Sequence, residues 1–214
     1  EELFSTSINE MNGLDVLVNN AGIYGPIGAS EEMDIESWKK SIDINLNGPF
    51  HLCQLAIKYF KIKKEGKIIN LSGGGATSPL PFISSYAASK AALVRLTETL
   101  ANEVDSYGIE INAIAPGALN TRLLDQVLKA GADNVGNHFY EKALKQKSEG
   151  GAPLSRGAAL CAYLASKKSG KINGKLISAI WDPWENLVKH FENSLSSDIY
   201  TLRRIIPEDR GENW

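Results

Sequence analysis

The chain has 214 residues, of which 43% are hydrophobic and 22% are charged, and its formal net charge at pH 7 is −2. This composition predicts one globular domain with a sizeable core, and it argues against a nucleic-acid-binding surface, which needs an excess of positive charge. No apolar run approaches the length of a membrane span, and the first residues do not resemble a signal peptide. Because the two cysteines and three histidines are scattered, we expect a cytoplasmic protein with neither a disulfide framework nor a metal site.

Strands and helices alternate along the chain. Short apolar runs predict buried strands at residues 14–18, 68–71, 110–115 and 175–180. Helical patterns are found at residues 1–12, from Asp34 to about residue 46, from there to about Lys63, at 86–104 and at 158–164. The alternation predicts an α/β fold in three layers, a doubly wound parallel sheet with helices on both faces.

The first strand is followed directly by Asn19, Asn20, Ala21 and Gly22. Asn and Gly after a parallel strand permit a tight turn and bring the backbone close to a ligand. An ordinary turn is the alternative for this stretch taken alone.

Asn45 lies near the end of the helix that Asp34 caps, before an interruption predicted at residues 47–49. In that apolar neighbourhood, a polar residue is either a capping residue or one that opens the helix locally and holds a water near Lys90.

The rest of the chain is organised around residues 67–90. A buried strand ends in Ser72, glycines and prolines form a crossing loop, and a helix begins near Tyr86. Ser84 or Ser85 is its expected cap. Tyr86 and Lys90 are four residues apart and therefore share one helix face. A hydroxyl at a strand end, a phenol and an ammonium can together form an acid/base site.

The Tyr-x-x-x-Lys spacing also occurs at Tyr59 and Tyr163. Both stand late in amphipathic helices, where we expect the tyrosine to lie in the core and the lysine in solvent. Tyr86 differs from them because a strand ending in serine precedes it and small residues surround it, so we assign the site to Tyr86.

The third strand leads into Pro116, Gly117 and Thr121, at the carboxyl edge where open α/β sheets place ligands. Residues 122–153 are rich in glycine and only weakly helical in pattern. This segment is expected to cover the substrate as a lid.

Taken together, these motifs resemble the classical short-chain dehydrogenase/reductase family over about residues 10–182. The matching pieces occur in the family's order: Asn19-Asn20-Ala21-Gly22, Asn45, Tyr86 with Lys90, Pro116-Gly117 with Thr121, and an ending of Leu164-Ala165-Ser166 and Ile172-Asn173-Gly174. The resemblance implies a Rossmann-like sheet, NAD or NADP as cofactor, and hydride transfer between the nicotinamide and a small-molecule carbonyl or alcohol.

The resemblance also implies residue roles. Tyr86 is the general acid for carbonyl reduction and the base for alcohol oxidation. Lys90 lowers the pKa of Tyr86 and binds the nicotinamide ribose, while Asn45 supports a water relay to Lys90. Pro116, Gly117 and Thr121 hold the nicotinamide end, and residues 19–22 line the adenosine side.

Two features depart from the family pattern. The family's second serine, thirteen positions before the tyrosine, is replaced here by Gly73, and Ser72 stands one position earlier. Ser72 either polarises the substrate through a loop shift or points away as a structural serine, since neighbouring strand residues face opposite sides. The family's N-terminal glycine-rich strand and turn are also absent, so we expect a truncated chain that binds neither cofactor when isolated.

We divide the chain into a catalytic portion, residues 1–181, and an extension, residues 182–214. The extension is expected to pack on the domain or on a partner subunit; the alternative is a clamp for a sugar or nucleotide-sugar that uses its arginines and aromatic residues. The resemblance implies a homodimer or homotetramer formed through helices at 48–63 and 86–104. The alternative to an enzyme is a catalytically silent relative that acts only in assembly.

Overall fold

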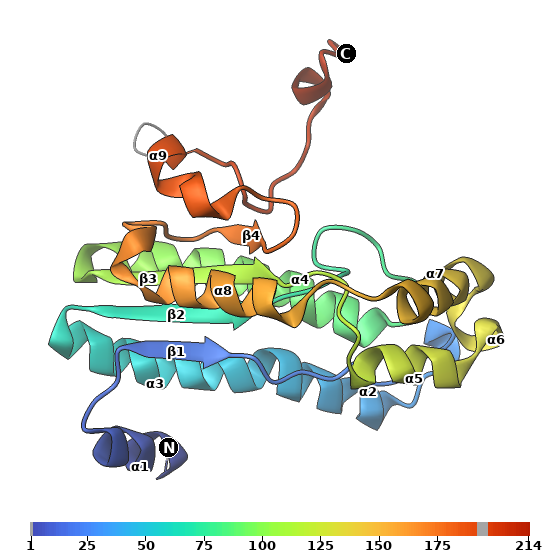
Figure 1. The fold of residues 1–214 in the computed structure, drawn as a ribbon, viewed down its shortest axis with the longest axis horizontal. Helices are drawn as coiled ribbons and strands as arrows, with labels where there is room; N and C mark the ends of the chain where they lie inside the picture. The colour runs from blue at the N-terminus through green and yellow to red at the C-terminus, as the bar shows by residue number, and fades with distance from the viewer. Residues whose placement is uncertain (1, 192–196) are drawn as a thin grey trace.

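The computed structural model describes residues 2–191 and 197–214 and contains a four-stranded parallel sheet (Figure 1). The strand order is the chain order, and the strands are β1 (Val16–Asn19), β2 (Gly66–Leu71), β3 (Ile109–Ala115) and β4 (Leu176–Ser178). Each strand lies within a residue or two of a predicted apolar run. The predicted α/β fold with a parallel sheet is therefore confirmed.

Nine α-helices occur in the described ranges: α1 (Glu2–Met11), α2 (Ile35–Ile42), α3 (Gly48–Lys63), α4 (Ser84–Val104), α5 (Arg122–Ala130), α6 (Ala132–Val135), α7 (Asn137–Glu149), α8 (Leu154–Ala165) and α9 (Leu187–Phe191). Asp34 caps α2 as predicted, because its Oδ2 accepts a hydrogen bond from Ser37 N at 2.7 Å. None of the helices described is long and apolar enough to cross a membrane.

Two local predictions were wrong. The predicted interruption at residues 47–49 is instead a π-helical turn, Asp43–Asn47, that joins α2 to α3 without a break; Pro49 is tolerated because it lies in the first turn of α3. The predicted cap of α4 by Ser84 or Ser85 is also absent. The N-cap is Ile83, and the Ser85 hydroxyl donates a hydrogen bond to Tyr24 O at 3.3 Å.

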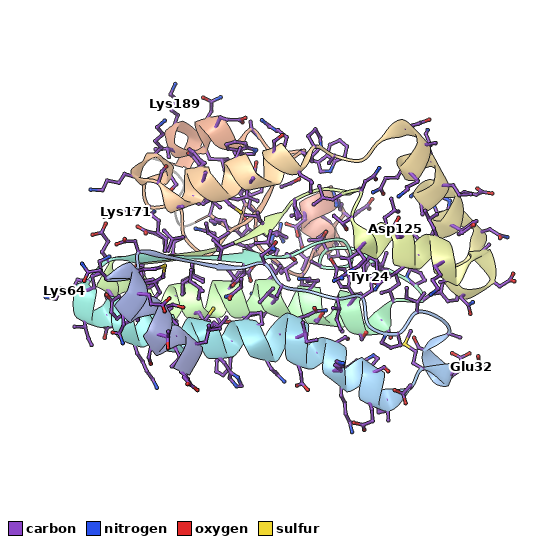
Figure 2. The ribbon with its side chains drawn as sticks, turned by 60° about the horizontal axis from the view of Figure 1, so that its bottom comes forward. Tyr24, Glu32, Lys64, Asp125, Lys171 and Lys189 are labelled. Atoms are coloured by element: carbon purple, nitrogen blue, oxygen red, sulfur yellow. The ribbon has the colours of Figure 1, made fainter. Side chains whose placement is uncertain are left out.

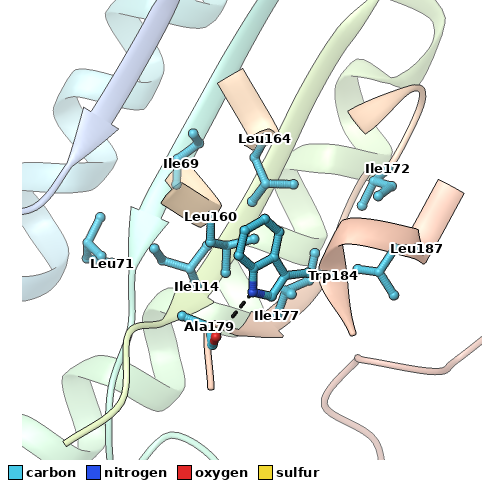
Figure 3. Close-up of a cluster of buried hydrophobic side chains, with 10 residues drawn as sticks. All are labelled: Ile69, Leu71, Ile114, Leu160, Leu164, Ile172, Ile177, Ala179, Trp184 and Leu187. Carbon is cyan, nitrogen blue, oxygen red and sulfur yellow. Dashed lines mark hydrogen bonds between the residues drawn. The ribbon is translucent and has the colours of Figure 1, made fainter. Parts of the chain in front are cut away.

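Helices lie on both sides of the sheet (Figure 2), and neighbouring residues of β2 belong to different core clusters. Ile69 and Leu71 face α8 and the segment after β4, where they pack in a cluster with Leu160, Leu164 and Trp184 (Figure 3). Ile68 faces the other layer, with Cys53, Ala56 and Phe60 of α3 and Leu100, Ala101 and Val104 of α4. Three layers result, as the continuous apolar strands predicted.

A buried polar network crosses the α3–α4 side of the sheet. Asn19 Nδ2 donates to Asn70 Oδ1 at 2.8 Å, and Asn70 Nδ2 donates to Thr97 Oγ1 at 2.8 Å. Cys53 lies beside both asparagines, and burial raises the pKa of its thiol to about 11. Asn19 and Asn70 are directly paired in the β1–β2 register, so the network ties two strands to α4.

Candidate functional site

The loops that follow the strands enclose a cavity of about 700 Å³ at the carboxyl edge of the sheet. Eight of the residues singled out by the sequence line it: Asn20, Gly22, Ser72, Tyr86, Lys90, Pro116, Gly117 and Thr121. Asn19 and Ala21 line a smaller hollow of about 170 Å³ with Asn20. The structure therefore brings residues from four separate segments of the chain to one place.

Tyr86 stands in the first turn of α4, with only 8% of its surface exposed. The Tyr24 ring packs against it edge-on, with ring centroids 4.7 Å apart. Burial, and secondarily Tyr24, raise the pKa of the Tyr86 phenol well above its ordinary value. Burial therefore decides the direction of this pKa in the free protein, and the expected lowering by the Lys90 charge stays a prediction. At neutral pH the phenol carries its proton, the state that a general acid requires.

Lys90 follows one turn later on α4 and is 4% exposed. Its Nζ lies 5.6 Å from the centroid of the Tyr86 ring and donates a hydrogen bond to Leu71 O at 2.6 Å. Burial lowers the pKa of its ammonium to about 8. The Leu71 carbonyl at the end of β2 therefore holds the Lys90 ammonium beside the phenol. This ammonium loses its proton just above neutral pH.

Asn45 is fully buried and lies in the π-helical turn, where the helix opens locally; the water that it would hold near Lys90 stays a prediction. Its Oδ1 accepts from Ile23 N at 2.9 Å, and its Nδ2 donates to Ile23 O at 2.8 Å and to Ser89 Oγ at 3.0 Å. The amide therefore ties the loop after β1 to the face of α4 that carries Ser89. A Cβ at Gly22 would lie 3.3 Å from Asn45 Oδ1 and 3.5 Å from Lys90 Nζ, so glycine lets the loop approach both groups.

Ser72 and Gly73 face different directions. Ser72 is buried, and its Oγ lies 3.5 Å from Lys90 O. A Cβ at Gly73 would instead lie 2.4 Å from Tyr86 Oη. Of the two alternatives for Ser72, the geometry favours a structural serine that points away from the substrate. Residue 73 faces the phenol, and because it is glycine it carries no side chain there.

This geometry gives the first prediction. Ser72→Ala is expected to change turnover by less than about fivefold, because a hydroxyl this far from its acceptor contributes at most a weak hydrogen bond. Gly73→Ala is expected to lower turnover more, since its methyl group forces Tyr86 Oη to move. Steady-state kinetics of both variants in the full-length protein are the measurement. A Ser72→Ala variant that loses more activity than Gly73→Ala would contradict this assignment.

The turn after β3 forms the opposite wall. Gly117 has a φ of +95°, and a Cβ there would lie 2.6 Å from Ile180 Cγ1, so glycine is required by both conformation and space. Thr121 caps α5, because its Oγ1 accepts from Leu123 N at 3.3 Å. The two residues set the direction in which the following segment crosses the cavity.

Sequence reasoning missed the apolar wall around Tyr86. Helices α5–α7 form the segment predicted to be weakly helical, and they pack a cluster onto the phenol from Leu124, Val127, Val135 and Ala143, together with Tyr24, Leu80 and Phe139. A helical spacing of apolar residues in α5 was the available signal.

Trp181 and Asp182, which follow β4, also line the cavity. Arg203, which the clamp alternative would use, forms ion pairs with Asp198 and Asp209.

Comparison with known proteins identifies the family of the chain. The family model described as short chain dehydrogenase matches residues 1–131. The 3beta-hydroxysteroid dehydrogenase 1 of Eggerthella lenta is 39% identical over 175 residues, which cover 81% of this chain and 65% of the relative. The D-beta-hydroxybutyrate dehydrogenase of Rhizobium meliloti is 31% identical over 183 residues, covering 83% of this chain and 70% of the relative.

Among solved structures, that of levodione reductase superposes with a TM-score of 0.73 at 28% identity, covering 82% of this chain and 68% of that one. This chain therefore spans roughly two thirds of the length of these relatives. The matched family model covers β1, β2 and β3, the buried phenol and the lysine described above. The chain belongs to the short-chain dehydrogenase family.

Proposed function

We propose that the full-length protein is an NAD(P)-dependent oxidoreductase that transfers a hydride between the nicotinamide and a carbonyl compound or secondary alcohol. One observation carries this proposal: a buried phenol and a buried ammonium lie one helical turn apart, and both face the cavity at the carboxyl edge of the sheet. Open α/β sheets bind ligands at this edge. A nicotinamide cofactor, when bound, supplies or accepts the hydride.

The cavity residues fit such a cofactor. Gly22 and Gly117 lie along its walls, and Lys90 and Thr121 offer hydrogen-bonding groups. Asn19 Oδ1, at the end of β1, is a buried acceptor without a hydrogen-bond partner among the described residues. Residues 19–22 would hold the adenosine side, and Pro116, Gly117 and Thr121 the nicotinamide end.

Each residue of the site then has a separate task. In carbonyl reduction, the protonated Tyr86 phenol donates a hydrogen bond and then its proton to the carbonyl oxygen. Lys90 supplies the positive charge that stabilises the phenolate formed by this transfer. Asn45 is a positioning residue, because its amide bonds hold the loop after β1 against α4. Gly73 leaves carbonyl polarisation to Tyr86 alone at this position.

The absence of a serine hydroxyl at Gly73 favours one alternative, a catalytically silent relative that acts in assembly. Assembly itself is proposed through α3 and α4, the helices at which the resemblance places a dimer interface. Sedimentation of the full-length protein should show a dimer or tetramer. Turnover with NAD or NADP, measured on the same sample, separates an active oligomer from a silent one.

The substrate end of the cavity favours an apolar carbonyl compound over the sugar or nucleotide-sugar of the clamp alternative. Leu80, Leu124, Val127 and Phe139 line the wall on the side of Tyr86. A sugar hydroxyl buried there without a hydrogen-bond partner would cost about 1–3 kcal/mol. The polar groups Lys142 and Gln146 also line the cavity, and the Gln146 amide donates to Asn120 Oδ1 at 3.1 Å.

Kinetics with matched substrates test this choice. With the full-length protein, kcat/KM for cyclic and long-chain aliphatic ketones should exceed that for ketoses or polyols. Phe139→Ala should lower kcat/KM for the ketones by about tenfold or more, because each lost apolar contact weakens binding. His138→Ala, an exposed position on the same helix, is the control. Turnover of polyols alone would reject the apolar substrate, whereas absence of turnover with every substrate and both cofactors would reject the enzyme itself.

A further inference from the structure

We infer that residues 197–202 form a positioning element for the active site: Leu202, clamped by Arg95 and Glu98 of α4, holds the glycine-rich turn that faces Tyr86. The inference goes beyond the proposed function, although its kinetic test rests on that function. Three sets of contacts carry it.

The first set lies along β4. Leu176 N donates a hydrogen bond to Tyr200 O at 2.8 Å, and Lys175 Nζ donates to Ser197 O at 2.6 Å. The segment 197–202 therefore runs beside the outer strand of the sheet and pairs with its backbone. Beyond this segment, the last residues extend away from the sheet (Figure 1). We call residues 197–214 the tail; its attachment is concentrated in a few residues of the segment 197–202.

The second set is a two-sided clamp on the Leu202 backbone. Glu98 Oε1 accepts a hydrogen bond from Leu202 N at 2.6 Å, while the Arg95 guanidinium donates to Leu202 O. Arg95 and Glu98 also form an ion pair with each other at 2.6 Å. Glu98 is only 5% exposed, and a buried carboxylate is stable only when charge and hydrogen bonds compensate its desolvation. The tail is thus the partner of a buried charge on the catalytic helix.

The third set links the clamp to the site. Leu202 packs against a small cluster formed by Ala76, Val94 and Ala113. Val94 lies one turn after Lys90 on α4, and Ala76 closes a turn by donating its N–H to Gly73 O at 3.3 Å. Gly73 is the residue whose Cβ would lie 2.4 Å from Tyr86 Oη.

The turn from Gly73 to Ala76 is confined on its other side by α4. A Cβ at Gly75 would lie 2.8 Å from Ala87 Cβ, so the backbone of the turn rests directly on the first turns of the helix. With three glycines, this turn has little rigidity of its own. Leu202 covers the cluster to which Ala76 belongs, and the turn is therefore held between the tail and the helix.

Four variants of the full-length protein test this role. Leu202→Ala removes the packing, Glu98→Ala removes the backbone acceptor, and Glu98→Gln keeps an acceptor without the charge. Asp209→Asn is the matched control, because it weakens an ion pair of the tail beyond the clamp. Hydrogen exchange of peptides covering residues 73–77, kcat, the cofactor KM and Tm are measured for each.

We expect Leu202→Ala and Glu98→Ala to speed amide exchange in residues 73–77 and to lower kcat by about tenfold or more, with the cofactor KM within about twofold. Misplacement of a catalytic group by about 1 Å can cost on the order of 100-fold. Glu98→Gln should recover most of kcat, and Asp209→Asn should leave kcat and exchange in residues 73–77 unchanged.

A lower Tm with unchanged kcat and unchanged exchange in residues 73–77 would show that the tail is merely structural and would overturn the inference. The exchange measurement needs no turnover. It therefore decides the inference even if the proposed oxidoreductase activity fails.

Discussion

Replacement of Tyr86 by phenylalanine in the full-length protein is expected to lower turnover by about 10²–10⁴-fold, the usual contribution of a general acid. The change removes one oxygen from a buried ring and leaves the apolar packing with Tyr24 and the α5–α7 cluster in place. Cofactor affinity should therefore stay close to that of the unchanged protein. Single-turnover kinetics, together with calorimetric binding of NAD and NADP, separate the two quantities.

Two other tyrosines provide matched controls. Tyr163 packs against Trp184 with ring centroids 5.6 Å apart, in the layer of α8. Tyr59 lies on α3, beside the α3–α4 core. Tyr163→Phe and Tyr59→Phe should keep their turnover. If Tyr86→Phe retains most of its rate, the role assigned to this phenol is refuted.

Lys90→Met should have the second largest effect, a loss of turnover of about 10²–10³-fold, the usual result of removing a preorganised charge from a catalytic site. Lys90 and methionine have similar unbranched stems, so the packing of α4 should survive. Cofactor affinity should also fall, in contrast to Tyr86→Phe. An active Lys90→Met variant would show that the ammonium is dispensable.

The lowered pKa of Lys90 predicts how kcat/KM and the free energy of unfolding depend on pH. Since kcat/KM reports groups of the free enzyme, kcat/KM for reduction should fall as the pH rises through about 8 and the ammonium loses its proton. The effect on stability has the opposite sign. Between pH 8 and about 10.4 the unfolded chain binds more protons at this lysine than the folded one, so the free energy of unfolding should rise by up to about 3 kcal/mol over this window.

Denaturant unfolding at several pH values measures this rise. The Lys90→Met protein, which lacks the titrating group, should show a smaller change between pH 8 and 10.4 than the unchanged protein. Equal slopes in the two proteins would mean that the pKa of Lys90 is not lowered in the folded state.

The strands and the pairing of Tyr86 with Lys90 could be predicted because each depends on local pattern. Ile68, Ile69 and Leu71 place buried apolar side chains on both faces of the strand, as expected of a strand covered on two sides. Tyr86 and Lys90 share a helix face by spacing alone. Asn45 was recognisable as a polar residue in an apolar stretch, and the π-helical turn around it is the structural reason for its burial.

The remaining features depend on contacts between distant segments. The direction of Ser72 could not be chosen, since alternation along a strand says that neighbours differ but not which one faces Tyr86. Ser85 looked like a helix cap because its sequence neighbours gave no sign of Tyr24 O, the acceptor that it uses. Glu98 gave no signal either, because its partner is the backbone of Leu202, more than one hundred residues later.

The paired amides of Asn19 and Asn70 also have a consequence for how the chain reaches this fold. Apolar parallel strands fit one another almost equally well at several offsets, because isoleucine, leucine and valine side chains are nearly interchangeable in shape. A slip of β1 by one residue would place Val18 or Asn20 opposite Asn70 and leave amide groups without partners inside the protein. Each such group costs roughly 1–3 kcal/mol. The two asparagines thus select one alignment during folding, at the edge of the sheet where the ligand-binding loops begin.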